Sequence, residues 1–248
     1  MKTILVKGPA LSRSGYGEQT RFALRALRAY ESRFNILLVN IPWGQTGWIA
    51  ESGEERDWYD QILAKGHVHM QQQLPVDISL QVTIPNEWEK IAPINIGYTA
   101  GIETTKIAPQ WIEKARMMDK IIVVSNHSKN VFNETTYTGV VQGTEEEVTI
   151  QNTTEIEVVN YPVRSLEVEN LDIELDYDFN FLAVAQMGPR KNIANTVYWF
   201  IDEFHNEEVG LVLKANTANC TTQDFLRTKA SLKEITNKYP DRKCKIYL

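Results

Sequence analysis

The sequence predicts an α/β protein made of two doubly wound, Rossmann-like domains, the second of them incomplete. Short apolar runs alternate along the chain with segments of helical periodicity, and the apolar runs are continuous rather than interleaved with polar residues. Continuous apolar strands separated by helices are typical of a mostly parallel sheet that is covered on both faces. An acidic stretch interrupts this rhythm, which then starts again, and this indicates two domains.

The first predicted domain covers residues 1–163. Its strands are expected at 4–6, 35–40, 77–84, 94–98, 120–125 and 156–160. Its helices are expected at 54–65, 109–118 and 126–132, and around a shared apolar face of Ala23, Leu24, Leu27 and Tyr30. Residues 138–163 depart from this pattern as a Thr- and Glu-rich polar excursion that ends in the last strand.

Residues 164–178 form a predicted acidic linker, and the second domain covers residues 179–248. Its strands are expected at 179–185, 209–215 and 243–248, with helices at 222–239 and around an apolar face of Ile193, Val197, Phe200, Ile201 and Phe204. Three strands and two helices leave at least one sheet edge exposed. We therefore expect that the sequence stops inside a second α/β domain, or that a partner completes it.

Composition narrows the class of protein. The 26 lysines and arginines are outnumbered by 32 acidic residues, and no basic block dominates, so a general nucleic-acid binder is disfavoured. Cys220 and Cys244 show no metal-ligand spacing, which favours free thiols in a reducing compartment. His67 and His69 lack a third ligand, so no metal site is expected. Without a signal peptide or an apolar run of membrane-spanning length, we expect a cytoplasmic protein. Peripheral membrane contact and oligomeric state stay open.

The first loop, residues 7–20, follows a strand and opens a helix. Gly15-Tyr16-Gly17 begins like a dinucleotide-binding fingerprint, but Thr20 stands in the third glycine position and Asn40 ends the second strand where a ribose-binding acid is expected. A nicotinamide cofactor is therefore disfavoured, and the absence of a G-K-[ST] motif excludes a P-loop. Two interpretations remain. Backbone amides at the helix start hold a phosphate or sugar hydroxyls, or the glycines form a flexible turn.

The second candidate site begins at Gly188-Pro189, where the first strand of the second domain ends. Arg190 and Lys191 follow at the expected helix start, where cations are unfavourable beside the positive end of the helix dipole. Their position makes sense if an anion such as a diphosphate occupies the site, and Lys214 is assigned to the same diphosphate site. The alternative is a solvated surface turn.

A third group of polar residues follows the central strands of the first domain. Thr99 and Glu103 come after the strand at 94–98, and Asn126 comes after the strand at 120–125. In a doubly wound domain the carboxyl ends of the strands carry the ligand, so these residues are candidates for binding a ligand there. Glu103 is a candidate catalytic carboxylate, with a merely solvated loop glutamate as the alternative.

Three segments carry a resemblance to a known family. Together with the Gly-rich first loop, "GIETTKIAPQW" (101–111), "DKIIVVSNHSKNVF" (119–132) and "FLAVAQMGPRKNI" (181–193) resemble retaining glycosyltransferases of the GT-B fold, of the group-1 or family-4 type. The resemblance implies two Rossmann-like domains with the active site between them. It also implies an N-terminal domain for a sugar or glycan acceptor and a C-terminal domain for a nucleotide-sugar donor. Hexosyl transfer with retention would need no cofactor beyond this co-substrate and no metal ion.

The resemblance assigns roles to single residues. Lys191 matches the family's diphosphate-binding lysine, whereas Gln186 stands where the partner arginine is usual, and Arg190 is expected to compensate. The family's active-site histidine has no clear match, and "YTAGIET" (98–104) stands in its place. The chain also ends before the family's late Gly-rich and glutamate segment. We therefore expect little or no transferase activity from these residues alone. A non-catalytic sugar- or nucleotide-binding module and a GT-B-shaped nucleotide-sugar epimerase stay open as alternatives.

Overall fold

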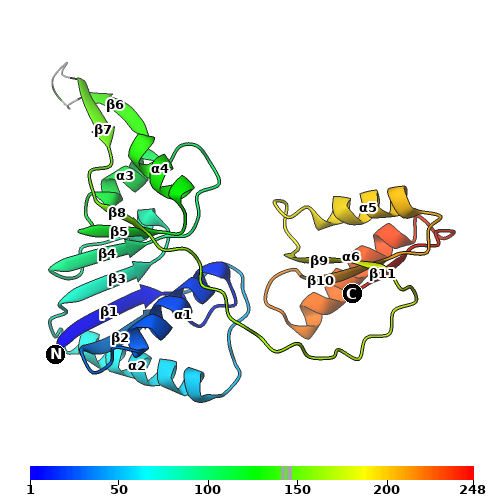
Figure 1. Ribbon diagram of the computed structural model, residues 1–248, viewed down its shortest axis with the longest axis horizontal. Helices are drawn as coiled ribbons and strands as arrows, with labels where there is room; N and C mark the ends of the chain where they lie inside the picture. Colours follow the sequence, from blue (N-terminus) through cyan, green and yellow to red (C-terminus); the bar gives the residue numbers. More distant parts are fainter. Residues whose placement is uncertain (141–142, 144–146) are drawn as a thin grey trace. The chain divides into compact units, whose positions relative to one another are not determined.

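The structure is a computed structural model, and it describes residues 1–140, 143 and 147–248. The chain divides into two compact units. Unit 1 comprises Met1–Trp43 and Ile49–Arg164, and unit 2 comprises Gly44–Trp48 and Ser165–Leu248. Figure 1 shows the strands and helices of each unit.

Unit 1 is built on a six-stranded parallel sheet in the order β2-β1-β3-β4-β5-β8. The strands are β1 (Lys2–Gly8), β2 (Phe34–Asn40), β3 (Ile78–Val82), β4 (Ile94–Tyr98), β5 (Lys120–Val123) and β8 (Ile156–Val158). The predicted α/β class with a mostly parallel sheet is therefore confirmed. The chain runs from β1 outward to β2 and then returns to β3 on the other side of β1, so the direction of winding reverses between β1 and β3. Ligands of open α/β sheets bind at such a reversal, outside the carboxyl ends of the strands.

Side chains alternate along the strands of unit 1, so apolar residues are buried on both faces of the sheet. On one face, Ile4, Val6, Ile36 and Leu38 pack with Leu24 of α1 (Gly15–Arg28) and with aromatic residues of α2 (Glu54–Gln71). The other face packs against α3 (Pro109–Ala115), α4 (Asn126–Glu134) and the region of the short 3₁₀ helix η1 (Pro85–Glu87). Continuous apolar strands thus match a sheet covered on both sides.

Helix α2 lies beside β2, at the edge of the sheet (Figure 1). Gly66 allows this approach because a Cβ atom at that position would overlap the backbone oxygen of Leu38. A helix along an edge strand shields its unpaired backbone groups from other chains.

Three details of unit 1 differ from the sequence expectations. Tyr30 lies beyond the end of α1, in the following turn, and is 52% exposed, so it does not belong to the buried helix face. Helix α2 continues to Gln71 instead of ending near Lys65. Within the expected polar excursion, β6 (Thr136–Val140) and β7 (Glu147–Gln151) pair as an antiparallel hairpin. Residues 141–142 and 144–146 of the excursion lie outside the described residues.

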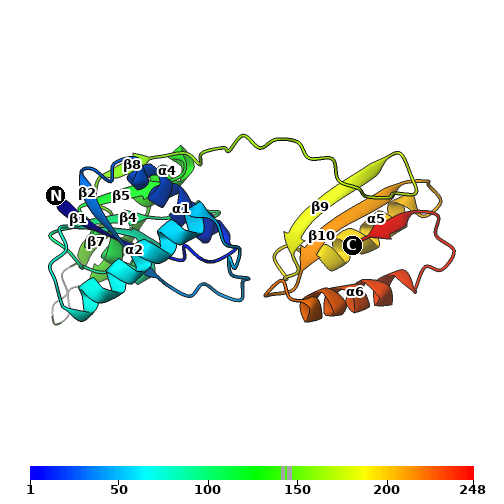
Figure 2. The ribbon, with the colours of Figure 1, turned by 90° about the horizontal axis from the view of Figure 1, so that it is seen from below.

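Unit 2 contains a parallel three-stranded sheet in the order β11-β10-β9. The strands are β9 (Asn180–Gln186), β10 (Gly210–Asn216) and β11 (Lys245–Tyr247), and they alternate with α5 (Ile193–Phe204) and α6 (Thr222–Thr236). Leu211 and Leu213 of β10 pack with residues of both helices in one core, so both helices cover the same face. Figure 2 shows α6 running along one side of these strands.

The opposite face of the unit 2 sheet is open. Leu182 and Val184 of β9 are 70% and 64% exposed. In unit 2 the two helices lie on one side of the sheet only.

No helix within the described ranges is both long and apolar enough to cross a membrane.

Candidate functional site

The first loop of unit 1 is held rigidly by a buried arginine. Arg21 of α1, 7% exposed, donates from Nη1 to the backbone oxygens of Ala10 (2.7 Å) and Ser12 (2.8 Å). The amide of Leu11 donates to Oδ1 of Asn40 at the end of β2 (3.0 Å). A cation fixing two carbonyl groups makes strong, charge-assisted hydrogen bonds. The loop is therefore a braced structure that joins the carboxyl ends of β1 and β2.

The glycines of this loop have distinct roles. A Cβ atom on Gly17 would overlap the backbone oxygen of Ser12, whereas a Cβ atom on Gly15 would meet nothing within 4 Å. Oγ of Ser14 caps the helix by accepting from the Gly17 amide (3.0 Å). Of the amides expected to hold a phosphate, that of Gly17 is thus already bonded, which leaves those of Gly15 and Tyr16 at the helix start.

Tyr16 links the first loop to the end of β4. Its hydroxyl lies 2.9 Å from Oγ1 of Thr99 and accepts from the amide of Ala100 (3.2 Å). Burial raises the pKa of the Tyr16 hydroxyl, and the bonds to Thr99 and Ala100 oppose that rise only in part. The Tyr16 ring also packs on Trp43, with 4.4 Å between ring centroids. Because Thr99 is only 1% exposed and bonded to Tyr16, the structure gives it a positioning role rather than contact with a ligand.

Glu103 and Asn126 are both exposed and lie on segments that are joined by a hydrogen bond. The amide of Ile102 donates to Oγ of Ser128 in α4 (3.2 Å). Asn126 is the first residue of α4, whose start is capped by Ser125. The structure therefore places these two predicted acceptor-side residues after neighbouring parallel strands, with their side chains open to solvent.

Two further polar residues at this end of unit 1 were not among the predicted site residues. Gln19 is 1% exposed, and the Tyr161 hydroxyl donates to its Oε1 (3.5 Å). Within the described residues, Nε2 of Gln19 has no hydrogen-bond partner. Burial raises the pKa of the Tyr161 hydroxyl. The sequence could have indicated Gln19 as a site residue, because it follows Gly15 by about one helical turn and so lies on the same side of α1.

In unit 2, the turn after β9 carries the predicted basic pair. The amides of Lys191 and Asn192 both donate to the backbone oxygen of Gly188 (3.0 Å each). Asn192 has a left-handed backbone (φ 53°), and α5 begins only at Ile193. Arg190 and Lys191 are thus exposed turn residues that precede the helix, not members of its first turn.

A hollow of about 330 Å³ lies beside this turn, at the carboxyl end of β9. Its lining combines the turn, the start of α5 and the residue after β10: Met187, Gly188, Pro189, Asn192, Ile193, Ala194 and Thr217. Carboxyl ends of parallel strands are where α/β sheets bind ligands. The hollow is therefore placed as that rule expects.

The β10–α6 loop is fixed next to the hollow by a buried carboxylate. Asp224 accepts hydrogen bonds from Oγ1 of Thr217 (3.0 Å) and from the amide of Asn219. Burial alone would raise the pKa of Asp224, but these hydrogen bonds outweigh burial and hold the pKa below its ordinary value. Gln186, which stands where the resembled family has an arginine, donates to the backbone oxygen of Thr217 (3.1 Å).

Lys214 does not join the basic pair at this hollow. It is paired in register with Val184. Its neighbours Leu211 and Leu213 face the helices, so alternation puts Lys214 on the open face of the sheet. The three cations predicted for one diphosphate site are therefore divided between the turn and the open face.

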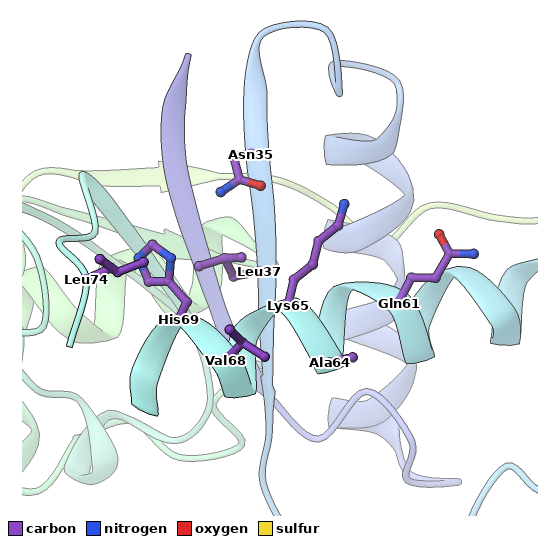
Figure 3. A pocket seen from close by; sticks show the side chains of 8 residues that line it. All are labelled: Asn35, Leu37, Gln61, Ala64, Lys65, Val68, His69 and Leu74. Carbon is purple, nitrogen blue, oxygen red and sulfur yellow. The ribbon is translucent and has the colours of Figure 1, made fainter. Parts of the chain in front are cut away.

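Two hollows of unit 1 lie apart from the loops described above. One, of about 580 Å³, lies between α2 and β2 and is lined mainly by hydrocarbon; Figure 3 shows Asn35, Leu37, Gln61, Ala64, Lys65, Val68, His69 and Leu74 around it. Its His69 ring is already within hydrogen-bonding distance of the Pro75 backbone oxygen (3.0 Å). The other is an apolar groove of about 500 Å³ along α1, with Leu80 and Ile122 in its wall. Neither gathers the convergent polar groups of a reaction site.

Among the residues that the structure describes, no three histidine, cysteine or acidic side chains are grouped so that they could hold a metal ion. Cys220 is exposed and Cys244 is buried, and both are free thiols. A scan against protein-family models finds no match, and a search of curated proteins finds no significantly similar sequence.

Proposed function

We propose that this chain is part of a retaining glycosyltransferase, in which the turn after β9 binds the diphosphate of a nucleotide-sugar donor. The observation that carries the proposal is the coincidence of a hollow, a basic pair and a helix start at the carboxyl end of β9. The resemblance of the 181–193 segment to the donor-binding segment of that family points to the same place.

The start of α5 favours an anion for a physical reason. Asn192 could cap the helix, but in its left-handed conformation its side chain makes no capping hydrogen bond. Helices α2 and α3 also lack a side-chain cap, whereas α1, α4 and α6 are capped by the side chains of Ser14, Ser125 and Thr221. The first amides of a helix lack acceptors within the helix, and the dipole favours negative charge there. A phosphate at this position would bond those amides and neutralise two nearby cations.

The proposed roles follow from this electrostatic arrangement. Lys191 and Arg190 stabilise the negative charge that develops on the departing diphosphate, which is the step where fixed cations lower a barrier. The acceptor is assigned to unit 1, with Glu103 and Asn126 as the exposed candidates for binding its hydroxyl groups. Tyr16, Thr99 and Gln19 hold the shape of that end of unit 1.

The proposal is tested by calorimetric titration of the chain with uridine, guanosine and adenosine diphosphates and their sugar derivatives. We expect one of the nucleotides to bind, and Lys191→Ala to weaken its Kd about tenfold, the effect of losing one charge-assisted contact. Arg227→Ala is the matched control, because Arg227 is an exposed cation of the same unit that lies on α6, outside the turn that carries Lys191. Equal weakening by both substitutions would overturn the assignment, because a non-specific charge effect would then explain the binding.

A nucleotide-release assay on a longer version of the chain separates an enzyme from a binding module. Release of free nucleotide from a bound nucleotide sugar, dependent on Lys191, supports the transferase. Tight binding of a nucleotide sugar by a longer version of the chain, without turnover under any acceptor, supports a non-catalytic module.

A further inference from the structure

The linker before β9 has the pattern of a strand with one apolar side. Aliphatic residues and acids are interleaved between Ser165 and Tyr177, and a strict alternation covers Leu171, Ile173 and Leu175, with Asp172, Glu174 and Asp176 between and after them. Asn170 separates this run from Leu166 and Val168, which lie on the opposite side of an extended chain. A period of two, as in 171–175, is typical of a segment that buries one side and leaves the other in water. The exposed fraction of the aliphatic side chains falls from 97% at Val168 to 37% at Leu175. Figure 2 shows this stretch as an extended segment leading to β9.

A basic and apolar hollow lies between α6 and β11, on the same unit. It measures about 230 Å³, and its lining consists of Phe225, Lys229, Leu232, Lys233, Thr236, Arg242, Ile246 and Leu248. Three of these described lining residues are cations and none is acidic. The charge of the hollow is therefore opposite to that of the linker, while its floor is apolar like the linker's aliphatic side.

Arg242 holds part of this charge in a fixed place. Its Nη1 donates to the backbone oxygens of Thr236 (2.9 Å) and Tyr239 (2.8 Å) at the end of α6. Its Nε is buried and has no hydrogen-bond partner within the described residues. The fixed guanidinium therefore contributes positive charge to the hollow, which attracts acidic groups without a bond to the buried Nε.

The linker is already attached beside β11 at its far end. The amide of Asp176 donates to the Tyr247 hydroxyl (2.9 Å), and its carboxylate lies 3.7 Å from Nζ of Lys245. Ile246, between these two residues, lines the hollow. The five residue steps from Asp176 back to Leu171 reach roughly 17 Å when extended, about three times the distance of about 5 Å between neighbouring strands. The linker can therefore pass round the edge of β11 to the hollow of its own chain.

We propose that residues 166–175 dock in the hollow between α6 and β11 of the same chain. Leu171 and Ile173 cover its apolar floor, and the long side chains of Lys229 and Lys233 reach the acids on the outer side of the docked segment. The attachment at Asp176 favours the chain's own linker over a second copy, because a short tether gives a local concentration on the order of millimolar. The inference is independent of the proposed function.

Hydrogen exchange of the 248-residue chain, followed by mass spectrometry, tests this docking. We expect amides in 166–175 to exchange about tenfold or more slowly than an unstructured peptide of the same sequence at low salt. This protection should decrease as salt rises, since exposed charge pairs are screened. Lys229→Glu with Lys233→Glu should abolish it, and adding Asp172→Lys with Glu174→Lys should restore it. Arg227→Glu, on the same helix but outside the hollow, should leave it unchanged.

Each other outcome contradicts the proposal. Exchange of the linker at the unstructured rate would show that it does not dock. Protection that persists when the charges of Lys229 and Lys233 are reversed would show that the linker docks elsewhere. Protection that grows with protein concentration would assign the hollow to a second copy of the chain. Lys229 and Lys233 are exposed, so circular dichroism should show the same fold in the variants.

Discussion

Substituting Gly17 tests whether the braced first loop is as rigid as its hydrogen bonds indicate. In Gly17→Ala, the new methyl group would overlap the backbone oxygen of Ser12, which would have to retreat by more than about 1 Å to reach ordinary contact. That oxygen accepts from the buried Arg21 (2.8 Å), so the retreat also breaks a charge-assisted hydrogen bond. Overpacking together with this loss should cost about 2–4 kcal/mol of unfolding free energy.

The matched control is Gly15→Ala, two residues earlier in the same helix. No atom lies within 4 Å of a Cβ there, so the substitution should be neutral or stabilise by up to about 1 kcal/mol. Urea unfolding followed by the fluorescence of the buried Trp58 and Trp88 reports on unit 1. In thermal unfolding followed by the same fluorescence, the Tm of Gly17→Ala should lie about 5–15 °C below that of the control. Equal stabilities of the two variants would refute the reasoning, because the loop would then accommodate the new methyl group with no loss of unfolding free energy.

Three further outcomes are expected in unit 1. Tyr16→Phe should cost about 1–3 kcal/mol of unfolding free energy in urea, because the amide of Ala100 and the hydroxyl of Thr99 then lose their hydrogen-bond partner. The matched Tyr161→Phe, at a residue 49% exposed, should cost less than about 0.5 kcal/mol, and equal costs would contradict the bridge. Arg25 holds the pKa of Glu55 below its ordinary value, so this pair stabilises the fold above about pH 4.3 and loses that contribution as pH falls through the lowered pKa. Between pH 6 and pH 3, Glu55→Gln should therefore lose less unfolding free energy than the parent protein. The difference should be below about 1 kcal/mol, because the pair is partly exposed. Equal losses in the two proteins would show that the pair does not contribute to the pH dependence. Phe132→Ala, which empties a fully buried site, should lower the unfolding free energy by about 3–5 kcal/mol in the same urea assay, and a change below 1 kcal/mol would mean that the core collapses around it.

The candidate site was predictable from the sequence where a local rule applies. Gly188-Pro189 ends a strand, and a helix follows, so the sequence placed the turn and its basic pair at the carboxyl end of a parallel strand. The helix start was predicted too early, because the left-handed Asn192 delays α5 to Ile193. Backbone conformation at a single non-glycine residue is not encoded in hydrophobic periodicity.

Other parts of the site depended on contacts between distant segments. The hydroxyl of Thr99 was expected to face a ligand, yet it bonds Tyr16, which lies 83 positions earlier in the sequence. Lys214 was grouped with Arg190 and Lys191 from its place near a strand end, but the register of β10 against β9 turns it to the open face. The β6–β7 hairpin was also missed, because its strands are short and mostly exposed and so lack a buried apolar run.

By itself, the sequence determined the alternation of strands and helices and the parallel sheet of unit 1. These follow from hydrophobic periodicity and from turn-forming residues, which act over a few neighbouring positions. Only the tertiary structure decided the strand order, the bracing of the first loop by Arg21, the burial of Thr99 and the open face of the unit 2 sheet. Those features depend on which distant segments come into contact, and the free energy of such contacts is set by packing and hydrogen bonding across the fold, not by local propensity.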